Sequence, residues 1–175
     1  MKKMVLSLLL LLGGCAVTPP SGVTPITDFE LDRYLGKWYE IARLDHSFER
    51  GLSKVSATYS LREDGGVQVV NRGYDDRAGV WKEAEGRAYF LGESSVGSLK
   101  VSFFGPFYGG YHIIALDQAN YSYAMISGPN RDYLWILARD RELPPAVLED
   151  LLQQARALGF ATDQLIMVGQ DREDT

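Results

Sequence analysis

The side chains that could perform chemistry are few and scattered along the chain. His46 and His112 are the only histidines, they lie in different regions, and neither has a carboxylate pair at metal-ligand spacing beside it. Several serines are present, but none lies in a nucleophile-elbow motif. The sequence therefore predicts neither a catalytic centre nor a metal site, and it calls for no cofactor.

One reactive group has a defined place, the thiol of Cys15, which is the only cysteine in the chain. A basic start at residues 1–4 and an almost unbroken apolar run at residues 5–12 precede it, and together they are typical of a secretory signal peptide. No disulfide can form within the chain. A secreted protein that keeps a free cysteine is one interpretation of this pattern.

The ending from Leu12 to Cys15 resembles the lipobox of bacterial lipoproteins, although Gly13 is a less usual residue at its place. The resemblance implies cleavage before Cys15 and acylation of the new N-terminus. Ala16 follows where an aspartate would imply retention in the inner membrane. We therefore expect a lipid-anchored protein of the outer membrane, on its periplasmic face.

The rest of the chain predicts one domain. Residues 1–14 are the expected signal peptide, residues 15–27 the acylated cysteine with a proline-containing tether, and residues 28–175 the folded domain. The formal net charge is −5, and no basic stripe is present that would neutralise phosphates, so nucleic acid is not an expected partner.

Short apolar and aromatic runs separated by turn residues predict an all-β fold with eight strands. Consecutive strands joined by hairpins close most simply as an antiparallel up-and-down β-barrel. Helical spacing of apolar residues then predicts one helix from Pro144 to Gly159, packed outside the barrel, and residues 165–168 form a short final strand. The predicted barrel strands are residues 37–44, 53–62, 66–74, 79–91, 97–104, 110–116, 121–127 and 132–139.

Strand alternation places several small residues on inner faces, among them Ala42, Ala57, Ala84, Gly86 and Ala88. Small side chains at these positions would leave room inside an eight-stranded barrel, which predicts a cavity. The alternative is that aromatic side chains from other strands fill the space.

Glu40 lies two residues after Trp38 and shares its inward face, so we expect its carboxyl group to be buried and hydrogen-bonded, to Asn71 or to a tyrosine hydroxyl. A structural role and contact with a ligand both remain open for it. Charged residues around the mouth are interpreted either as a solvated rim or as cations that hold the head of an amphiphile.

The stretch Gly36-Lys37-Trp38-Tyr39, together with Arg139 at the end of a strand, the strand count and the lipobox, resembles the lipocalin family, and within it the bacterial outer-membrane members. The resemblance covers nearly all of the chain after residue 28. It implies that Trp38 plugs the closed end of the barrel, that Arg139 caps it, and that the loop from Asp45 to Leu52 is a lid. Since the disulfide of many animal lipocalins is absent, we expect a mobile tail after Val168.

Strand alternation and the resemblance together predict a structural motif and a set of ligand-binding residues. The motif is Gly36, Trp38 and Arg139. The ligand-binding residues are Ala42, Leu44, Phe48, Val55, Ala57, Tyr59, Val69, Asn71, Ala84, Ala88, Val101, Phe103, Tyr111, Ile113, Tyr133 and Trp135.

The function implied by the resemblance is binding of a fatty acid, a lysophospholipid or a similar hydrophobic ligand in the cavity, for maintenance or storage of envelope lipid. An aromatic cluster near the mouth would line the pocket and leave an apolar rim, which could touch lipid or a second copy in a homodimer. Two alternatives are a tethered protein-interaction module with a filled barrel and a lipid-modifying enzyme, although no nucleophile for the latter is evident.

Overall fold

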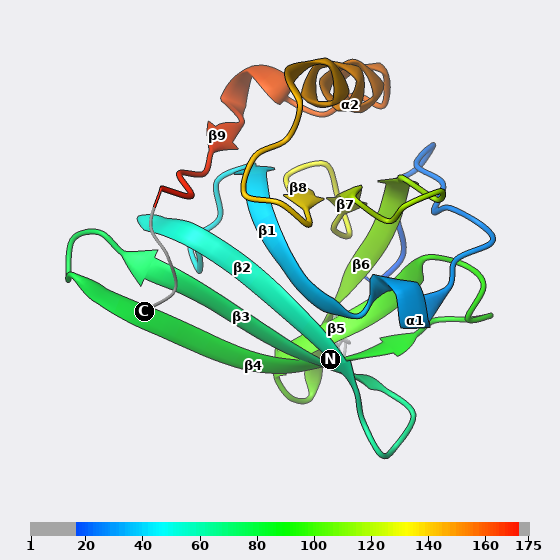
Figure 1. Cartoon of the computed structure of the whole chain (residues 1–175). Helices are drawn as coiled ribbons and strands as arrows, with labels where there is room; N and C mark the ends of the chain where they lie inside the picture. Colours follow the sequence, from blue (N-terminus) through cyan, green and yellow to red (C-terminus); the bar gives the residue numbers. More distant parts are fainter. Residues whose placement is uncertain (1–16, 172–175) are drawn as a thin grey trace, which may run out of the picture.

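The computed structural model describes residues 17–171, so the expected signal peptide, Cys15 and residues 172–175 lie outside the described part. Within it the chain is mostly β-structure (Figure 1). The elements are α1 (Leu31–Tyr34), β1 (Gly36–Arg43), β2 (Leu52–Leu61), β3 (Val67–Asp75), β4 (Val80–Phe90), β5 (Ser98–Phe104), β6 (Phe107–Leu116), β7 (Tyr123–Ser127), β8 (Leu134–Ala138), α2 (Pro145–Ala157), the 3-10 helix η1 (Thr162–Gln164) and β9 (Ile166–Met167).

The strands close into a barrel. Each strand from β2 to β8 pairs with the next, β8 pairs with β1, and β1 pairs with β2, always antiparallel. β9 is the extra strand and joins the edge of β1. The predicted eight-stranded antiparallel up-and-down barrel with an outer helix and a short final strand is thereby confirmed.

The barrel has two ends. We call the end beside α1 the closed end, and the end formed by the β1–β2, β3–β4, β5–β6 and β7–β8 connections the open end. Figure 1 shows the β3–β4 hairpin projecting beyond the neighbouring strands. Because β4 pairs with β5 only over Arg87–Phe90, its first half has a neighbour on one side only.

A β-bulge in β1 decides which side chains point into the barrel. Glu40 lies opposite Leu137, whereas Ala42 lies opposite Ile136, so the register shifts by one residue between them. Such a shift turns every later side chain to the other face. Arg43 therefore points inward, and Ala42 points outward.

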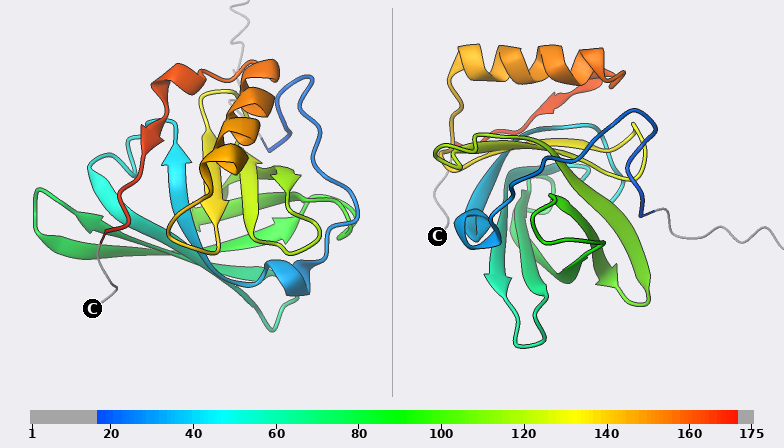
Figure 2. Two further views of the ribbon diagram at one scale, coloured as in Figure 1. Left: turned by 45° about the horizontal axis from the view of Figure 1, so that its top comes forward. Right: turned by 90° about the vertical axis from the view of Figure 1, so that its right-hand side faces the viewer.

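The protein has two cores. One fills the barrel around Trp38, Tyr59 and Ile113. The other lies between the barrel wall and α2, where Leu151 and Ala155 pack against the outward side chains of β8. Figure 2 shows α2 lying across the outside of the barrel. Within residues 17–171, no helix has the length and apolarity needed to cross a lipid bilayer.

Both ends of the described chain are tied to the barrel. The Ile26 amide donates to the Ile113 carbonyl at 2.9 Å, so the expected tether is held on the wall here. At the other end the Gln170 side chain donates to the carbonyls of Glu40 and Val55, each at 2.8 Å. The expectation of a mobile tail after Val168 is therefore wrong as far as Gln170. The Gln170 side chain links β1 to β2 just beyond the last residues at which these two strands pair.

Candidate functional site

The closed end is sealed by one indole and one guanidinium. Trp38 is fully buried and donates from its ring nitrogen to the Tyr34 carbonyl at 2.8 Å. The Arg139 guanidinium lies over the indole, 4.0 Å from the ring centroid. It also donates to the carbonyls of Arg33, Lys37 and Tyr121. Gly36 has φ +94°, a conformation that favours glycine, and it brings the chain close to Arg139.

Three tyrosine hydroxyls lie close together inside the barrel, near the closed end. The Tyr111 hydroxyl lies 2.7 Å from that of Tyr34 and 2.9 Å from that of Tyr59. Burial raises the pKa of Tyr34 and of Tyr111 well above the usual value, so both hydroxyls stay neutral. The three hydroxyls form hydrogen bonds with one another, and they can also offer a hydrogen bond to a polar ligand atom.

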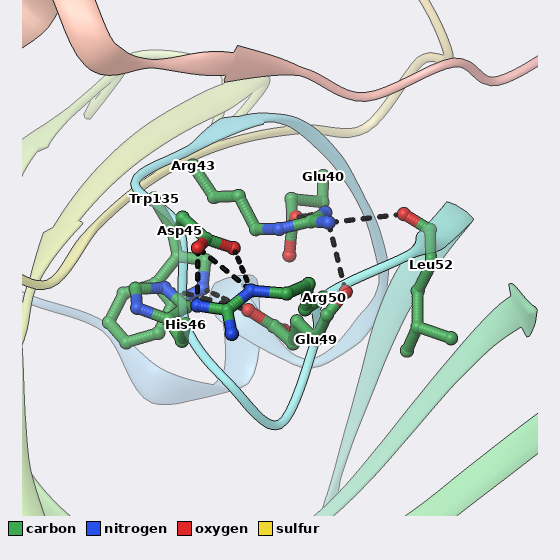
Figure 3. A network of polar contacts seen from close by, with 8 residues as sticks. All are labelled: Glu40, Arg43, Asp45, His46, Glu49, Arg50, Leu52 and Trp135. Atoms are coloured by element: carbon green, nitrogen blue, oxygen red, sulfur yellow. Dashed lines mark hydrogen bonds and ion pairs between the residues drawn. The ribbon is translucent and has the colours of Figure 1, made fainter.

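Beneath the β1–β2 loop a charged cluster points into the barrel (Figure 3). Arg43 donates to the Glu40 carboxylate at 2.8 Å and to the backbone carbonyls of Glu49 and Leu52. Trp135 donates from its indole nitrogen to the Glu49 carboxylate at 3.0 Å. Arg43 and Glu40 are only 2% and 3% exposed, so this ion pair is removed from water. Glu40 is buried as expected, but its partner is Arg43.

The cluster contains two carboxyl groups for one guanidinium. Burial raises the pKa of Glu40 well above its ordinary value, and the nearby Glu49 carboxylate raises it further, while Arg43 acts in the opposite direction. Burial also raises the pKa of Glu49. The pair consequently retains a proton to a higher pH than isolated glutamates do.

His46 holds the β1–β2 loop against the open end of the barrel. Its ring stacks between those of Phe48 and Tyr133, with centroid distances of 5.0 Å to each. Burial lowers the pKa of His46 to about 4, and the positive Arg43 adds to this effect. The imidazole is therefore neutral near pH 7, and its Nε2 atom lies 3.6 Å from the Glu49 carboxylate.

The structure brings most of the predicted ligand-binding residues to the barrel interior. Asn71 and Ala84 face each other across β3 and β4, on the side of Val69. Ala84 is exposed to solvent, which reaches the inner wall here because β4 is unpaired on one side. The buried interior members are Ala57, Tyr59, Val69, Ala88 and Ile113, and the partly buried ones that pack against them are Val101, Phe103, Tyr111 and Trp135. Val55 is buried in β2, Tyr133 is half-buried, and Phe48 is exposed on the loop.

Ala42 and Leu44 differ from the expectation. Both pack in the core between the barrel and α2 and so lie outside the barrel. The cause is the bulge in β1, which also turns Arg43 inward, whereas unbroken alternation from Trp38 and Glu40 would place it on the outer face. No glycine or proline marks the bulge in the sequence, so alternation alone could not locate it.

No group of three or more metal-ligating side chains gathers within residues 17–171. His112 is fully buried on the outer side of β6, where its Nδ1 atom lies 2.9 Å from the Ser98 hydroxyl. The polar groups of the described interior include the Arg43 guanidinium, two carboxyl groups, three phenols, the Asn71 amide and the Trp135 indole N–H. They can bind and orient a polar head while the wall binds an apolar body.

A family model of the lipocalin-like domain matches residues 29–170. The chain belongs to the lipocalin family. It is 57% identical over 160 residues to the outer membrane lipoprotein Blc of Vibrio cholerae, covering 91% of this chain and 93% of that protein. Apolipoprotein D of Bos taurus is 37% identical over 139 residues, covering 71% and 70%.

Solved lipocalins share the fold. Insecticyanin of the tobacco hornworm Manduca sexta superposes with a TM-score of 0.70 at 22% identity, covering 87% of this chain and 86% of that one. The Blc protein of Escherichia coli K12, 55% identical over 153 residues, is likewise named an outer membrane lipoprotein, covering 87% of this chain and 86% of that protein. The present lipocalin is accordingly a lipid-anchored outer-membrane protein.

Proposed function

We propose that this lipocalin holds or transports a single-tailed amphiphile, a fatty acid or a lysophospholipid, for maintenance or storage of envelope lipid, and that it catalyses no reaction. The observation that carries the proposal is a barrel interior that combines an apolar inner wall, reached by solvent at Ala84, with a buried polar cluster centred on Arg43. A tail on the wall would gain about 25 cal/mol per Å² of apolar area removed from water.

The head group would lie near the cluster beneath the loop. Arg43 already contacts Glu40, so an anionic head would compete for the guanidinium while the displaced carboxylate takes up a proton from the solvent. Because the Glu40 and Glu49 pair readily keeps a proton, this exchange needs no unpaired buried charge.

The test is organic extraction of the purified protein with mass spectrometry, followed by competition with a fluorescent fatty acid. Recovery of a single-tailed lipid and its displacement of the probe are expected. Neither extracted lipid nor probe binding would contradict the proposal.

A matched pair of variants locates the ligand. Ala84→Phe adds a ring to the inner wall, and Glu85→Phe adds the same ring to the outer face of the same strand. We expect Ala84→Phe to weaken probe binding at least tenfold and Glu85→Phe to leave it unchanged. Equal affinities would place the ligand elsewhere.

A further inference from the structure

A polar groove crosses the outer face of β3, β4 and β5. It has a volume of about 450 Å³, and Arg62, Arg87 and Ser102 are among the side chains that line it. Its centre is a row of residues on neighbouring strands, because Gln68 lies opposite Arg87 and Arg87 lies opposite Ser102. The groove lies outside the barrel, so the function proposed above uses none of these polar groups.

The Ser102 hydroxyl is a buried polar group without a partner. The residue is only 4% exposed, and within residues 17–171 its Oγ atom forms no hydrogen bond. Leaving a buried hydroxyl unpaired costs about 1–3 kcal/mol, so folded proteins keep few such groups. Because Ser102 lines the groove, a ligand that lies there can supply the missing hydrogen bond.

Arg87 provides a cation beside this hydroxyl. Its Nε atom donates to the Tyr108 hydroxyl at 3.1 Å, and no carboxylate of the described residues forms an ion pair with the guanidinium. One terminal nitrogen lies against the turn after β5, since a β-carbon added at Gly105 would lie 2.8 Å from it. The terminal N–H groups of Arg87 are therefore available to an anion in the groove.

The charged groups around the groove are three cations and two carboxylates, namely Arg62, Arg87, Lys100, Asp64 and Glu85. Asp64 pairs with Arg62 at 3.1 Å, so these two groups neutralise each other. Lys100 lies over the Tyr108 ring, 4.9 Å from its centroid. The local balance is one positive charge, although the whole chain is acidic. An unpaired guanidinium next to a hydroxyl donor suits the oxygens of a phosphate group.

The groove also reaches the barrel interior. β4 and β5 stop pairing at Arg87 and Ser102, and toward the open end β4 has no neighbour on this side. Gly86 and Phe103, the next residues of the two strands, both line the groove. Phe103 also packs against the core inside the barrel. A lipid with its head group in the groove can therefore pass its tail between β4 and β5.

We propose that this groove binds the phosphate group of a single-tailed phospholipid whose tail lies in the barrel. The cluster at Arg43 is only 2–3% exposed, which suits a small carboxylate, whereas a phosphate that carries a hydrated alcohol can remain in the groove. Fatty acid and lysophospholipid then use different sites for their heads. The inference rests on the proposed function for the place of the tail, and it assigns the phosphate to Arg87 and Ser102.

Calorimetric titration of the purified protein with palmitate and with lysophosphatidylglycerol, below its micellar concentration, tests this assignment. We expect Arg87→Gln to weaken lysophosphatidylglycerol binding at least tenfold and palmitate binding less than twofold. Arg72→Gln is the control, because Arg72 lies over the Trp81 ring on the same outer wall and should affect neither ligand. Equal effects of Arg87→Gln on the two ligands, or no effect on either, would overturn the assignment. Failure of the wild-type protein to bind either ligand would instead contradict the proposed function.

Two further variants separate a binding role from a structural one. Ser102→Ala should weaken lysophosphatidylglycerol binding at least threefold and leave the urea denaturation midpoint unchanged or raised, since the hydroxyl has no partner within the described protein. Glu85→Gln removes the opposing carboxylate and should strengthen that binding about twofold. A lower midpoint in Ser102→Ala with unchanged binding would show that the hydroxyl is structural and would overturn its role in the site.

Glycerophosphoglycerol, the same head group without a tail, identifies the source of the phosphate. We expect lysophosphatidylglycerol to shift the amide NMR signals of Ser102 and Gly105, and neither palmitate nor glycerophosphoglycerol to do so at equal concentration. Equal shifts with glycerophosphoglycerol would make a free phosphate compound the ligand and would overturn the assignment to a lipid.

Discussion

Two arginines of the same region show how burial determines the contribution of an ion pair to stability. Arg43 pairs with Glu40 inside the barrel, whereas Arg50 pairs with Asp45 in water. Removing one partner of a buried pair leaves the other buried without its partner and costs about 3–5 kcal/mol, and an exposed pair contributes at most about 1 kcal/mol. We expect Arg43→Met to lower the free energy of unfolding by that larger amount, and Arg50→Met by the smaller one. Urea denaturation measures both, and similar losses would mean that solvent reaches the cluster.

The pH dependence of stability should carry the signature of His46. Its pKa is about 4 in the folded protein against 6.5 in the unfolded chain, so the unfolded state binds a proton first. Stability from this group is therefore present above pH 6.5 and is lost as the pH falls toward 4.

The groups that face His46 titrate as well. Glu40 and Glu49 have raised pKa values, so their effect has the opposite sign and stability is lost as the pH rises above their unfolded value. The Arg43 guanidinium also faces the ring, and Asp45 has a lowered pKa because Arg50 binds it. Comparison with His46→Phe, which keeps an aromatic ring in the stack, isolates the histidine. The fall in melting temperature from pH 6.5 to 4 should be smaller in the variant, and parallel curves would contradict a buried neutral imidazole.

At the scale of the elements, strand alternation was sufficient to predict the barrel and much of its inner face. Ala57, Val69 and Ala88 lie in regular stretches and were assigned correctly to the interior. The prediction failed from the β1 bulge onward because a single extra residue inverts the pattern without any signal in composition. It also missed the burial of Glu49 and His46, since polar residues in a loop are ordinarily solvated and only their mutual contacts stabilise them inside.

Substitutions at the adjacent glycines Gly109 and Gly110 test whether residues 17–21 are held on β6. Alanine at Gly110 would force the Val17 carbonyl or the His112 ring to move, whereas a β-carbon at Gly109 meets no atom within 4 Å. We expect Gly110→Ala to raise hydrogen exchange at residues 17–21 at least tenfold and Gly109→Ala to leave it unchanged. Equal exchange in the two variants would mean that the contact does not restrain the segment.

Across the whole molecule, the closed end and the open end of the barrel have different roles. The closed end is sealed by contacts made within the protein, whereas the open end combines a stacked loop, a buried ion pair and exposed rings. Loops carry binding residues more often than the scaffold that supports them does. Stability and binding should therefore respond to different substitutions, and the closed end offers the cleanest case.

Arg139→Met removes the cation above Trp38 and three hydrogen bonds to backbone carbonyls. Hydrogen bonds from charged groups contribute about 1.5–3 kcal/mol each, although not additively, so the free energy of unfolding should fall by about 3 kcal/mol or more. Arg141→Met is the control, because Arg141 lies 5.3 Å from the Tyr39 ring centroid and a surface cation–π contact contributes only about 0.5–1 kcal/mol. Well below the melting temperature, fluorescent fatty acid should bind both variants with wild-type affinity. If Arg139→Met weakened binding tenfold while remaining folded, the closed end would be coupled to the site, and the separation of the two ends would be wrong.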